Sequence, residues 1–212
     1  MHIISTNVAD PTTIKWRGKN VKTGIFKKPT SEAIFLGTED VKGDEVSDRK
    51  HHGGIFKACY LFSADHYGYW KNLYPDLDWT YGMLGENLTI SGMDETQIYI
   101  GDIYKIGNAL VQITQPREPC YKFGVKFGTQ TVLKQFIEHG FPGTYVSVLE
   151  EGFVEAGDEM KIVKRADNSL TIVQFFELLF AKEKNQEHLK LAIQNKAIPQ
   201  SKRDKLSAYL TI

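Results

Sequence analysis

The sequence predicts a mixed, mainly β fold: a strand-rich barrel or sandwich with a few helices, followed by a small unit of three helices. Short runs of β-branched and aromatic residues, separated by turn residues, fill residues 1–165. Many short strands with scattered helices are typical of barrels and sandwiches. Near Ser169 the pattern changes to capping residues followed by helical apolar spacing. We therefore expect two domains, residues 1–168 and residues 169–212.

Five apolar runs are predicted strands: residues 33–36, 98–106, 109–115, 145–149 and 160–163. The second and third runs are joined by Gly107-Asn108. A connection of two turn residues between β-rich runs is typical of a hairpin. The third run should end at Pro116, because proline lacks the amide hydrogen that a central strand needs.

Two helices are predicted within this strand-rich part. Ser63 is a candidate N-cap for a helix that continues to about Leu73 and ends before Pro75. The second helix spans residues 131–139 and ends at Gly140, because glycine readily adopts the left-handed conformation that terminates a helix.

Three short helices are predicted after Ser169. Thr171 and Gln174 form a capping box before the first, and Ser201 and Asp204 form another before the third. Asn185 is the expected cap of the middle helix. Helices this short bury little surface on their own. We therefore expect them to pack on one another and on the strand-rich part.

The composition limits the class of protein. The 212 residues include 26 Lys and Arg and 26 Asp and Glu, so no overall charge favours nucleic acid or an anionic membrane. Two cysteines do not make a disulfide framework, and we expect a cytoplasmic protein with reduced thiols. The sequence contains no apolar run long enough for a signal peptide or a membrane span.

The segment ITQPREPCYKF, residues 113–123, holds the most informative cysteine. Arg117 and Lys122 flank Cys120, and nearby cations favour the thiolate form of a cysteine. The prolines at 116 and 119 stiffen the loop that carries the thiol. Such a thiolate could ligate a metal or attack an electrophile, while a buried structural thiol stays open as the alternative. Cys59, within the apolar run ACYLF, is a predicted core thiol.

Two further stretches are candidate binding loops. DRKHHGGIFK, residues 48–57, combines cations with two glycines, so consecutive backbone N–H groups could bind an anion. A solvated basic turn is the alternative. Zinc is disfavoured because His51 and His52 are adjacent in the sequence and no Cys-x-x-Cys accompanies them. LGENLTI, residues 84–90, is a weaker signal that turn chemistry alone explains.

Taken together, five stretches resemble the MOSC domain, the module at the C-terminus of molybdenum cofactor sulfurases, and its stand-alone bacterial YiiM-like branch with a three-helix extension. They are TGIFKKP (23–29), KGDEVSDRKHHGG (42–54), GENLTISGMDE (85–95), IGDIYKIGNALVQITQPREPCYKF (100–123) and GTYVSVLEEGFVEAGDEMKIVKR (143–165). The resemblance covers nearly the whole chain, and QPR-x-PC is its most specific part. It implies a β-barrel-like fold.

The resemblance also implies a cofactor and a site. Cys120 would ligate the molybdenum of a pterin cofactor, Mo-molybdopterin. The other cofactor-binding positions that it implies, together with the cations beside them, are Arg49, Lys50, His52, Gly53, Gly54, Lys57, Glu86, Asn87, Arg117, Tyr145 and Ser147. Thr144 departs from the family pattern, where relatives often carry a bulkier residue such as Trp, and this difference bears on the shape of the pocket.

Relatives reduce N-hydroxylated compounds, and the YiiM-like branch is associated with hydroxylaminopurines. The expected function is therefore a molybdenum-dependent reductase that detoxifies such base analogues. A separate reductase would supply electrons, because the chain carries no flavin or nicotinamide fingerprint. The alternatives are a sulfur carrier with a persulfide on Cys120 and a molybdopterin-binding protein without turnover. We expect neither a nucleic-acid nor a membrane partner. A homodimer contact through the helices is the alternative to their packing on the strand-rich part.

Overall fold

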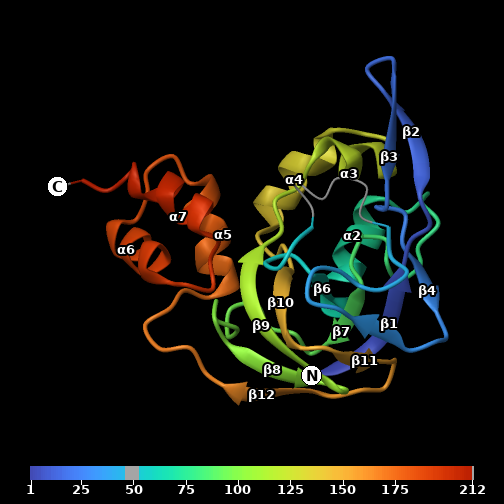
Figure 1. Ribbon diagram of the computed structural model, residues 1–212. Helices are drawn as coiled ribbons and strands as arrows, with labels where there is room; N and C mark the ends of the chain where they lie inside the picture. The colour runs from blue at the N-terminus through green and yellow to red at the C-terminus, as the bar shows by residue number, and fades with distance from the viewer. Residues whose placement is uncertain (46–52, 212) are drawn as a thin grey trace.

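The computed structural model describes residues 1–45 and 53–211, and a strand-rich body dominates it (Figure 1). Eight strands form one sheet in the order β12-β8-β9-β10-β6-β7-β1-β4. Their bounds are β1 His2–Val8, β4 Lys28–Thr30, β6 Cys59–Ser63, β7 Leu88–Ser91, β8 Ile103–Ile106, β9 Ala109–Pro116, β10 Thr144–Glu150 and β12 Met160–Lys164. β6 and β7 run parallel, and the other neighbouring pairs are antiparallel. The predicted mixed, mainly β fold is confirmed.

The sheet curls until its far strands meet. His2, at the start of β1, forms an isolated antiparallel bridge with Glu159, next to β12. The Met160 N–H donates to the Met1 carbonyl at 2.9 Å, and the Ile3 N–H donates to the Asp158 carbonyl at 2.9 Å. Within the described residues the contact is this bridge rather than a full ladder between β1 and β12, so the body is barrel-like without a closed ring of strand pairs.

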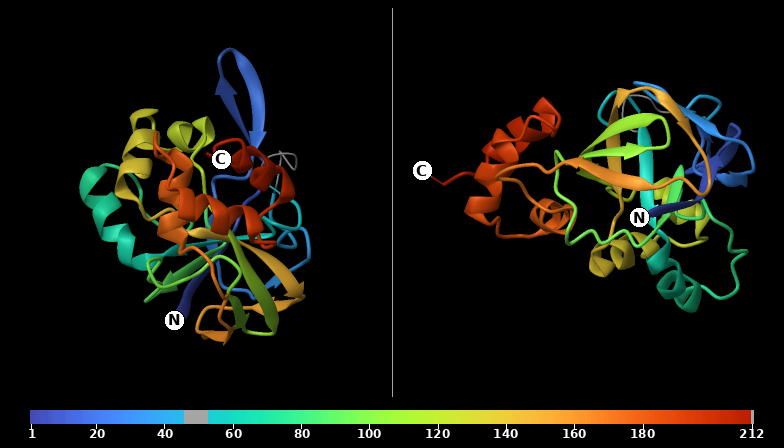
Figure 2. Two further views of the ribbon diagram at one scale, coloured as in Figure 1. Left: turned by 90° about the vertical axis from the view of Figure 1, so that its left-hand side faces the viewer. Right: turned by 90° about the horizontal axis from the view of Figure 1, so that it is seen from below.

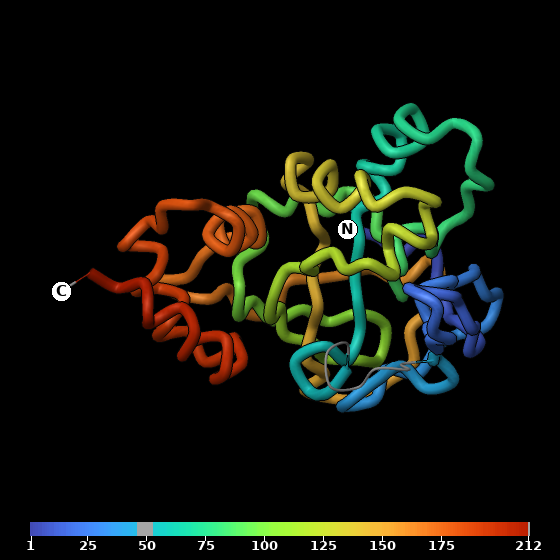
Figure 3. The backbone as a smooth tube through the Cα atoms, turned by 90° about the horizontal axis from the view of Figure 1, so that it is seen from above, coloured from blue at the N-terminus to red at the C-terminus, as the bar shows by residue number. Residues whose placement is uncertain are grey.

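Two small antiparallel pairs complete the strands. β5 (Ile34–Leu36) pairs with β11 (Gly152–Val154). β2 (Thr12–Trp16) pairs with β3 (Lys19–Thr23) in a hairpin that projects from the body (Figure 1). In Figures 1 and 3 this hairpin lies at the opposite end of the molecule from the C-terminal helices.

The predicted hairpin at Gly107-Asn108 is present, with Ile106 opposite Ala109. β9 ends at Pro116, as predicted. β8, however, starts at Ile103, so the prediction of a strand from residue 98 is wrong. Asp102 ends the extended run because its carboxylate accepts the Tyr99 N–H at 2.9 Å and stabilises a turn.

The helices of the strand-rich part are η1 (Ala64–His66), α2 (Tyr67–Leu73), α3 (Tyr121–Lys126) and α4 (Thr131–His139). α4 matches its predicted span, and Gly140 ends it in the left-handed conformation with φ 79°. Ser63 precedes η1, but its side chain makes no capping hydrogen bond. α3 was not predicted, because six residues with a central glycine carry no helical periodicity.

The C-terminal helices are α5 (Ile172–Phe180), α6 (Gln186–Gln194) and α7 (Gln200–Ser207). The capping box of Thr171 and Gln174 is confirmed, and Asn185 accepts the N–H groups of the first turn of α6. The capping box predicted at Ser201 and Asp204 is wrong. α7 begins two residues earlier, at Gln200 with Pro199 in the cap position, so both side chains lie within the helix.

One apolar cluster joins the sheet to these helices. It contains Val111 and Val146 from the sheet, Phe175 from α5 and Leu189 from α6. Cys59 belongs to the same cluster with 1% of its surface exposed, which confirms the predicted core thiol. A second cluster beneath α2, α3 and α4 is mostly aromatic. The two-domain division at residue 168 stays a prediction.

Across the described residues, no helix has both the length and the apolar character needed to cross a membrane. Figure 2 shows the three C-terminal helices stacked on one side of the curled sheet, with the N-terminus on the sheet itself.

Candidate functional site

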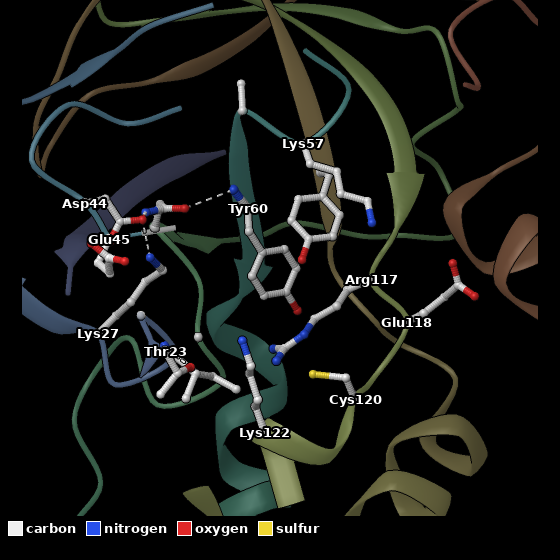
Figure 4. Close-up of a pocket in the computed structure, with 16 residues that line it drawn as sticks. Thr23, Lys27, Asp44, Glu45, Lys57, Tyr60, Arg117, Glu118, Cys120 and Lys122 are labelled. Carbon is white, nitrogen blue, oxygen red and sulfur yellow. Dashed lines mark hydrogen bonds and ion pairs between the residues drawn. The ribbon is translucent and has the colours of Figure 1, made fainter. Parts of the chain in front are cut away.

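A cavity opens where segments distant in sequence converge at one end of the sheet (Figure 4). The empty space within it is about 690 Å³, a figure that includes space open to solvent at its mouth. Among the described residues it is lined by Thr23, Gly24, Ile25, Lys27, Asp44, Glu45, Lys57, Ala58, Tyr60, Gly85, Asn87, Arg117, Glu118, Cys120, Lys122 and Tyr145. The cavity thus brings a thiol, four cationic side chains and two phenols together.

Cys120 lies between the end of β9 and the start of α3. Its backbone is extended, with φ −126° and ψ 168°, and its carbonyl accepts the Phe123 N–H at 2.9 Å as the helix begins. The thiol is half-buried and lines the cavity, whereas Cys59 is sealed in the core. Figure 4 shows the Cys120 sulfur pointing toward the Arg117 guanidinium.

Arg117 is held rigidly by its surroundings. Its guanidinium donates to the Leu84 carbonyl and lies over the rings of Tyr60 at 5.0 Å and Phe123 at 4.7 Å. A Cβ atom at Gly85 would sit 3.4 Å from the guanidinium, and Gly85 has φ +86°. Glycine is favoured there because of this left-handed conformation.

The charge of Arg117 persists although the side chain is buried. Burial alone would lower the pKa of Arg117, whereas Tyr60, Tyr145 and Cys120 raise it, and the net shift is upward. A buried cation stacked on aromatic faces is strongly oriented. Arg117 thus presents a fixed positive charge beside the thiol.

Three lysines add to the positive lining. Lys27 forms a buried ion pair with Asp44. The Lys57 ammonium lies 5.4 Å from the centre of the Tyr145 ring. Lys122 is buried, and its ammonium points into the same space as the guanidinium in Figure 4. A group with several negative oxygens would find charge-assisted hydrogen-bond donors on more than one side of this cavity.

The two phenols on the wall are neutral at physiological pH. Burial raises the pKa of Tyr60 and of Tyr145 above the usual value. The Tyr60 hydroxyl donates to the Pro142 carbonyl at 2.7 Å, and the two rings lie 5.1 Å apart. Tyr145 therefore offers the cavity a protonated hydroxyl.

Asn87 connects several parts of the wall. Its side-chain oxygen accepts the Tyr60 N–H at 3.2 Å, and its side-chain amide donates to Asp44 at 2.9 Å. Asp44 in turn pairs with Lys27 and accepts the Ala9 N–H at 2.8 Å. This network orients Lys27 from behind and keeps the charge of the pair compensated.

The predicted site residues divide into three groups. Those that line the cavity are Lys57, Asn87, Arg117, Cys120 and Tyr145. Those described but absent from its lining are Gly53, Gly54, Glu86 and Ser147. Those outside the described residues are Arg49, Lys50 and His52.

Glu86 has a structural place instead of a position on the cavity wall. Its side chain is 0% exposed and accepts hydrogen bonds from the Tyr67 hydroxyl, the Gly82 N–H at 3.0 Å and the Thr89 hydroxyl at 2.7 Å. These bonds stabilise the turn that carries Gly85 and Asn87. Sequence reasoning identified the motif but not which of its side chains reaches the cavity.

Lining residues that were not predicted as individuals include Lys27, Asp44, Tyr60 and Lys122. Lys27 and Asp44 lie within the stretches TGIFKKP and KGDE, where the family motif was a usable signal. Lys122, two residues after the thiol, is visible in the sequence only as a neighbouring charge. Tyr60 lies in an apolar run, and nothing in its local sequence distinguishes it from the core.

Comparison with known proteins adds independent information. The family model described as MOSC domain matches residues 48–161. "Uncharacterized protein YflK" of Bacillus subtilis is 35% identical over 170 residues, which cover 80% of this chain and 76% of that protein. A protein named "Reductase" from Gibberella moniliformis is 32% identical over 151 residues, covering 70% of this chain but 27% of that protein.

The same similarity appears among solved structures. The crystal structure of YiiM from Geobacillus stearothermophilus superposes with a TM-score of 0.82 and 31% sequence identity. The superposition covers 99% of each chain. The agreement therefore extends over the C-terminal helices as well as the sheet.

Proposed function

The chain belongs to the MOSC domain family as a YiiM-like member, and from this premise we propose that it is a molybdenum-cofactor-dependent reductase of N-hydroxylated small molecules, hydroxylaminopurines among them. The family is associated with binding the molybdenum cofactor, and one relative is named a reductase. The observation that carries the proposal is the Cys120 thiol beside Arg117 in a cavity with three further cations.

The residues of the cavity fit the cofactor. A thiolate is a soft ligand that suits a heavy transition metal, so Cys120 is the residue that would hold molybdenum. Arg117, Lys57 and Lys122 would hold the cofactor phosphate, because they are the donors that phosphate oxygens prefer. The bound cofactor supplies the redox chemistry, and the protein binds and orients it.

The side chains of the cavity wall supply protons and orientation. Reducing R–NHOH to R–NH₂ cleaves the N–O bond, consumes two electrons and two protons, and releases water. The Tyr145 hydroxyl is protonated and can donate toward the leaving oxygen. Arg117 cannot serve as a donor of protons, so its place is to orient negative oxygens.

The proposal is tested with protein purified from a host that makes the cofactor. Molybdenum would be measured in the wild type, in Cys120→Ser and in a matched control, Cys59→Ala, which removes the core thiol. Turnover of a hydroxylaminopurine would be followed with reduced methyl viologen as the electron source. Cys120→Ser should lose about 100-fold or more in rate, as expected for a residue that contacts the reacting group. Equal rates in wild type and Cys120→Ser would contradict the mechanism.

The half-buried thiol also fits a second function, that of a sulfur carrier with a persulfide on Cys120, because such a carrier needs an accessible cysteine among cations. Intact-protein mass spectrometry separates the two. A bound pterin supports the reductase, and an added mass of one sulfur on Cys120 supports the carrier. A bound pterin without turnover would indicate a cofactor-binding protein.

A further inference from the structure

Positive charge is concentrated in one segment of this electrically neutral chain. Lysines and arginines total 26, as do aspartates and glutamates, yet residues 11–31 contain six cations and no acidic residue. Four of the six lie on the β2–β3 hairpin: Lys15, Arg17, Lys19 and Lys22. The side chains of all four are exposed.

The strand register separates the two faces of this hairpin. Ile14 and Trp16 alternate with Lys15 along β2, so they point to the opposite side of the ribbon. Ile14 is 8% exposed, and the Trp16 ring stacks on the Tyr121 ring at 4.7 Å. One face of the hairpin is thus fixed to the protein body, and the other, with Lys15 and Lys22, faces solvent.

The tip of the hairpin is built as a tight turn. Arg17 and Gly18 both have positive φ, at 48° and 77°, as the favoured two-residue hairpin turn requires. The Arg17 guanidinium lies 5.6 Å from the centre of the Trp16 ring. The charge at the tip is therefore held near the Trp16–Tyr121 stack.

The hairpin is joined to the rim of the cavity at two points. Thr23, the last residue of β3, lines the cavity. Tyr121, which stacks on Trp16, directly follows Cys120. The hairpin therefore borders the opening that holds the thiol, with Trp16 and Thr23 on the side of the opening and Lys15 and Lys22 on the outer face of the ribbon.

Within the described part of the chain, none of the four hairpin cations has a carboxylate in ion-pair range. Exposed cations without acidic neighbours create a local positive field that steers an acidic partner into place. Such an array favours a negatively charged surface over an apolar one.

We propose that the β2–β3 hairpin is the docking surface for the electron donor, an acidic redox protein that presents carboxylates around its flavin. This inference rests on the proposed reductase function, which needs two electrons for each N–O bond cleaved. The reduced flavin is oxidised as it supplies them, and water leaves with the second proton. Electron-transfer contacts are typically small and guided by charge. A narrow basic hairpin beside a cavity fits such a contact better than it fits the extended surface of a nucleic acid or a membrane.

The test compares two charge-reversal variants with the wild-type holoenzyme. Lys15→Glu combined with Lys22→Glu changes the exposed face of the hairpin. Lys182→Glu combined with Lys190→Glu makes the same change in charge on the exposed C-terminal helical part, at the other end of the molecule (Figure 3). Turnover is measured with an acidic flavodoxin kept reduced by NADPH and its reductase, and separately with reduced methyl viologen.

The hairpin variant should turn over about 10-fold or more slowly with flavodoxin while its viologen-driven rate stays within about 2-fold of the wild type. The flavodoxin-driven rate of the wild type should fall as salt rises from about 50 to about 300 mM, and that of the variant should not. The control variant should behave like the wild type with both reductants.

Calorimetric titration of flavodoxin into each protein separates failure of the docking proposal from failure of the reductase function. Wild type that is inactive with viologen refutes the reductase function, and flavodoxin binding that depends on Lys15 and Lys22 still supports the docking surface. The docking proposal is overturned by equal flavodoxin-driven rates in the wild type and the hairpin variant, or by equal losses of rate with both reductants. Tighter binding of single-stranded DNA or phosphatidylserine vesicles than of flavodoxin also overturns it.

Discussion

Arg117 illustrates how single residues set the chemistry of the cavity. The guanidinium is 6% exposed, yet it stays charged because aromatic rings, a backbone carbonyl and the neighbouring thiol and phenols surround it. A lysine could not span the same contacts, since it lacks the planar fork that stacks and donates at once. The contacts of Arg117 therefore fix the position of the positive charge beside Cys120.

Glu95 is a buried acid behind the same wall. Its side chain is 0% exposed, and one oxygen accepts the Gly143 N–H at 3.0 Å. The other oxygen has no hydrogen-bond partner among the described residues. Burial raises the pKa of Glu95 to about 8, and the charge of Asp94 adds to this shift, whereas the Gly143 bond opposes it. Glu95 is thus mainly protonated at neutral pH.

The sign of the resulting pH dependence follows from proton binding. Between pH 4.5 and about 8 the folded protein holds a proton on Glu95 that the unfolded chain releases. The contribution of Glu95 to stability is therefore present at low pH and is lost as the pH rises, by at most about 1.4 kcal/mol per pH unit. Glu95→Gln should gain stability relative to the wild type from pH 5 to pH 8, as measured by urea unfolding. The exposed Glu183→Gln serves as the control, and a difference independent of pH would contradict the assignment.

At the scale of elements, hydrogen bonds between short segments fix the position of α3 beside the cavity. α3 carries Lys122 into the cavity, and its last residue, Lys126, contacts two other segments. The Lys126 amine donates to the Ile25 carbonyl at 2.9 Å and to the Gly82 carbonyl at 2.8 Å. It thereby connects the segment after β3 to the turn before β7. A neutral amine has two N–H donors, and the two carbonyls match them.

Lys126 should give a pH dependence of the opposite sign. Burial lowers the pKa of Lys126 to about 7, and the positive charges of Arg117 and Lys27 assist, against Glu86. The contribution to stability is then present above pH 10.5 and is lost as the pH falls toward 7, by at most about 1.4 kcal/mol per pH unit.

Lys126→Met should therefore fall further behind the wild type in free energy of unfolding at pH 9 than at pH 7. Urea titrations at the two pH values measure this difference. Lys134→Met, on the exposed surface of α4, is the matched control. If the deficit of Lys126→Met is the same at pH 7 and pH 9, the folded amine is charged over this range.

At the scale of the whole molecule, the sheet and the C-terminal helices share one core. Phe175 of α5 is 0% exposed and belongs to the same apolar cluster as the sheet strands. Lys202 of α7 pairs with Glu118 at 2.5 Å, in the loop that carries Cys120. The helices therefore support the segment that forms the cavity, and we expect sheet and helices to unfold together.

Phe175→Ala tests this coupling. Removing a fully buried phenylalanine should cost about 3–5 kcal/mol. The three tryptophans, Trp16, Trp70 and Trp79, all lie in the strand-rich part, so their fluorescence reports on that part alone. We expect the fluorescence and far-ultraviolet circular dichroism transitions to coincide and to shift together in the variant. Phe180→Ala, at a 37% exposed position of the same helix, is the control. An unchanged fluorescence transition in Phe175→Ala would show that the helices unfold independently.

Local chemistry allowed the sequence by itself to determine several elements of this protein. The turn at Gly107-Asn108, the end of β9 at Pro116 and the caps at Thr171, Asn185 and Gly140 follow from φ preferences and short-range hydrogen bonds. The motif around Cys120 likewise identified the family. These features depend on neighbours within a few positions along the chain.

Only the tertiary structure decided which side chains meet. Lys27 and Asp44 approach Tyr60 and Arg117 because separate strands of a curled sheet end at one place, and no local pattern encodes that convergence. The same packing turns Glu86 inward and brings the Cys120 thiol to the cavity. Proximity between distant segments comes from burial of a shared core, a property of the whole chain and not of any stretch of it.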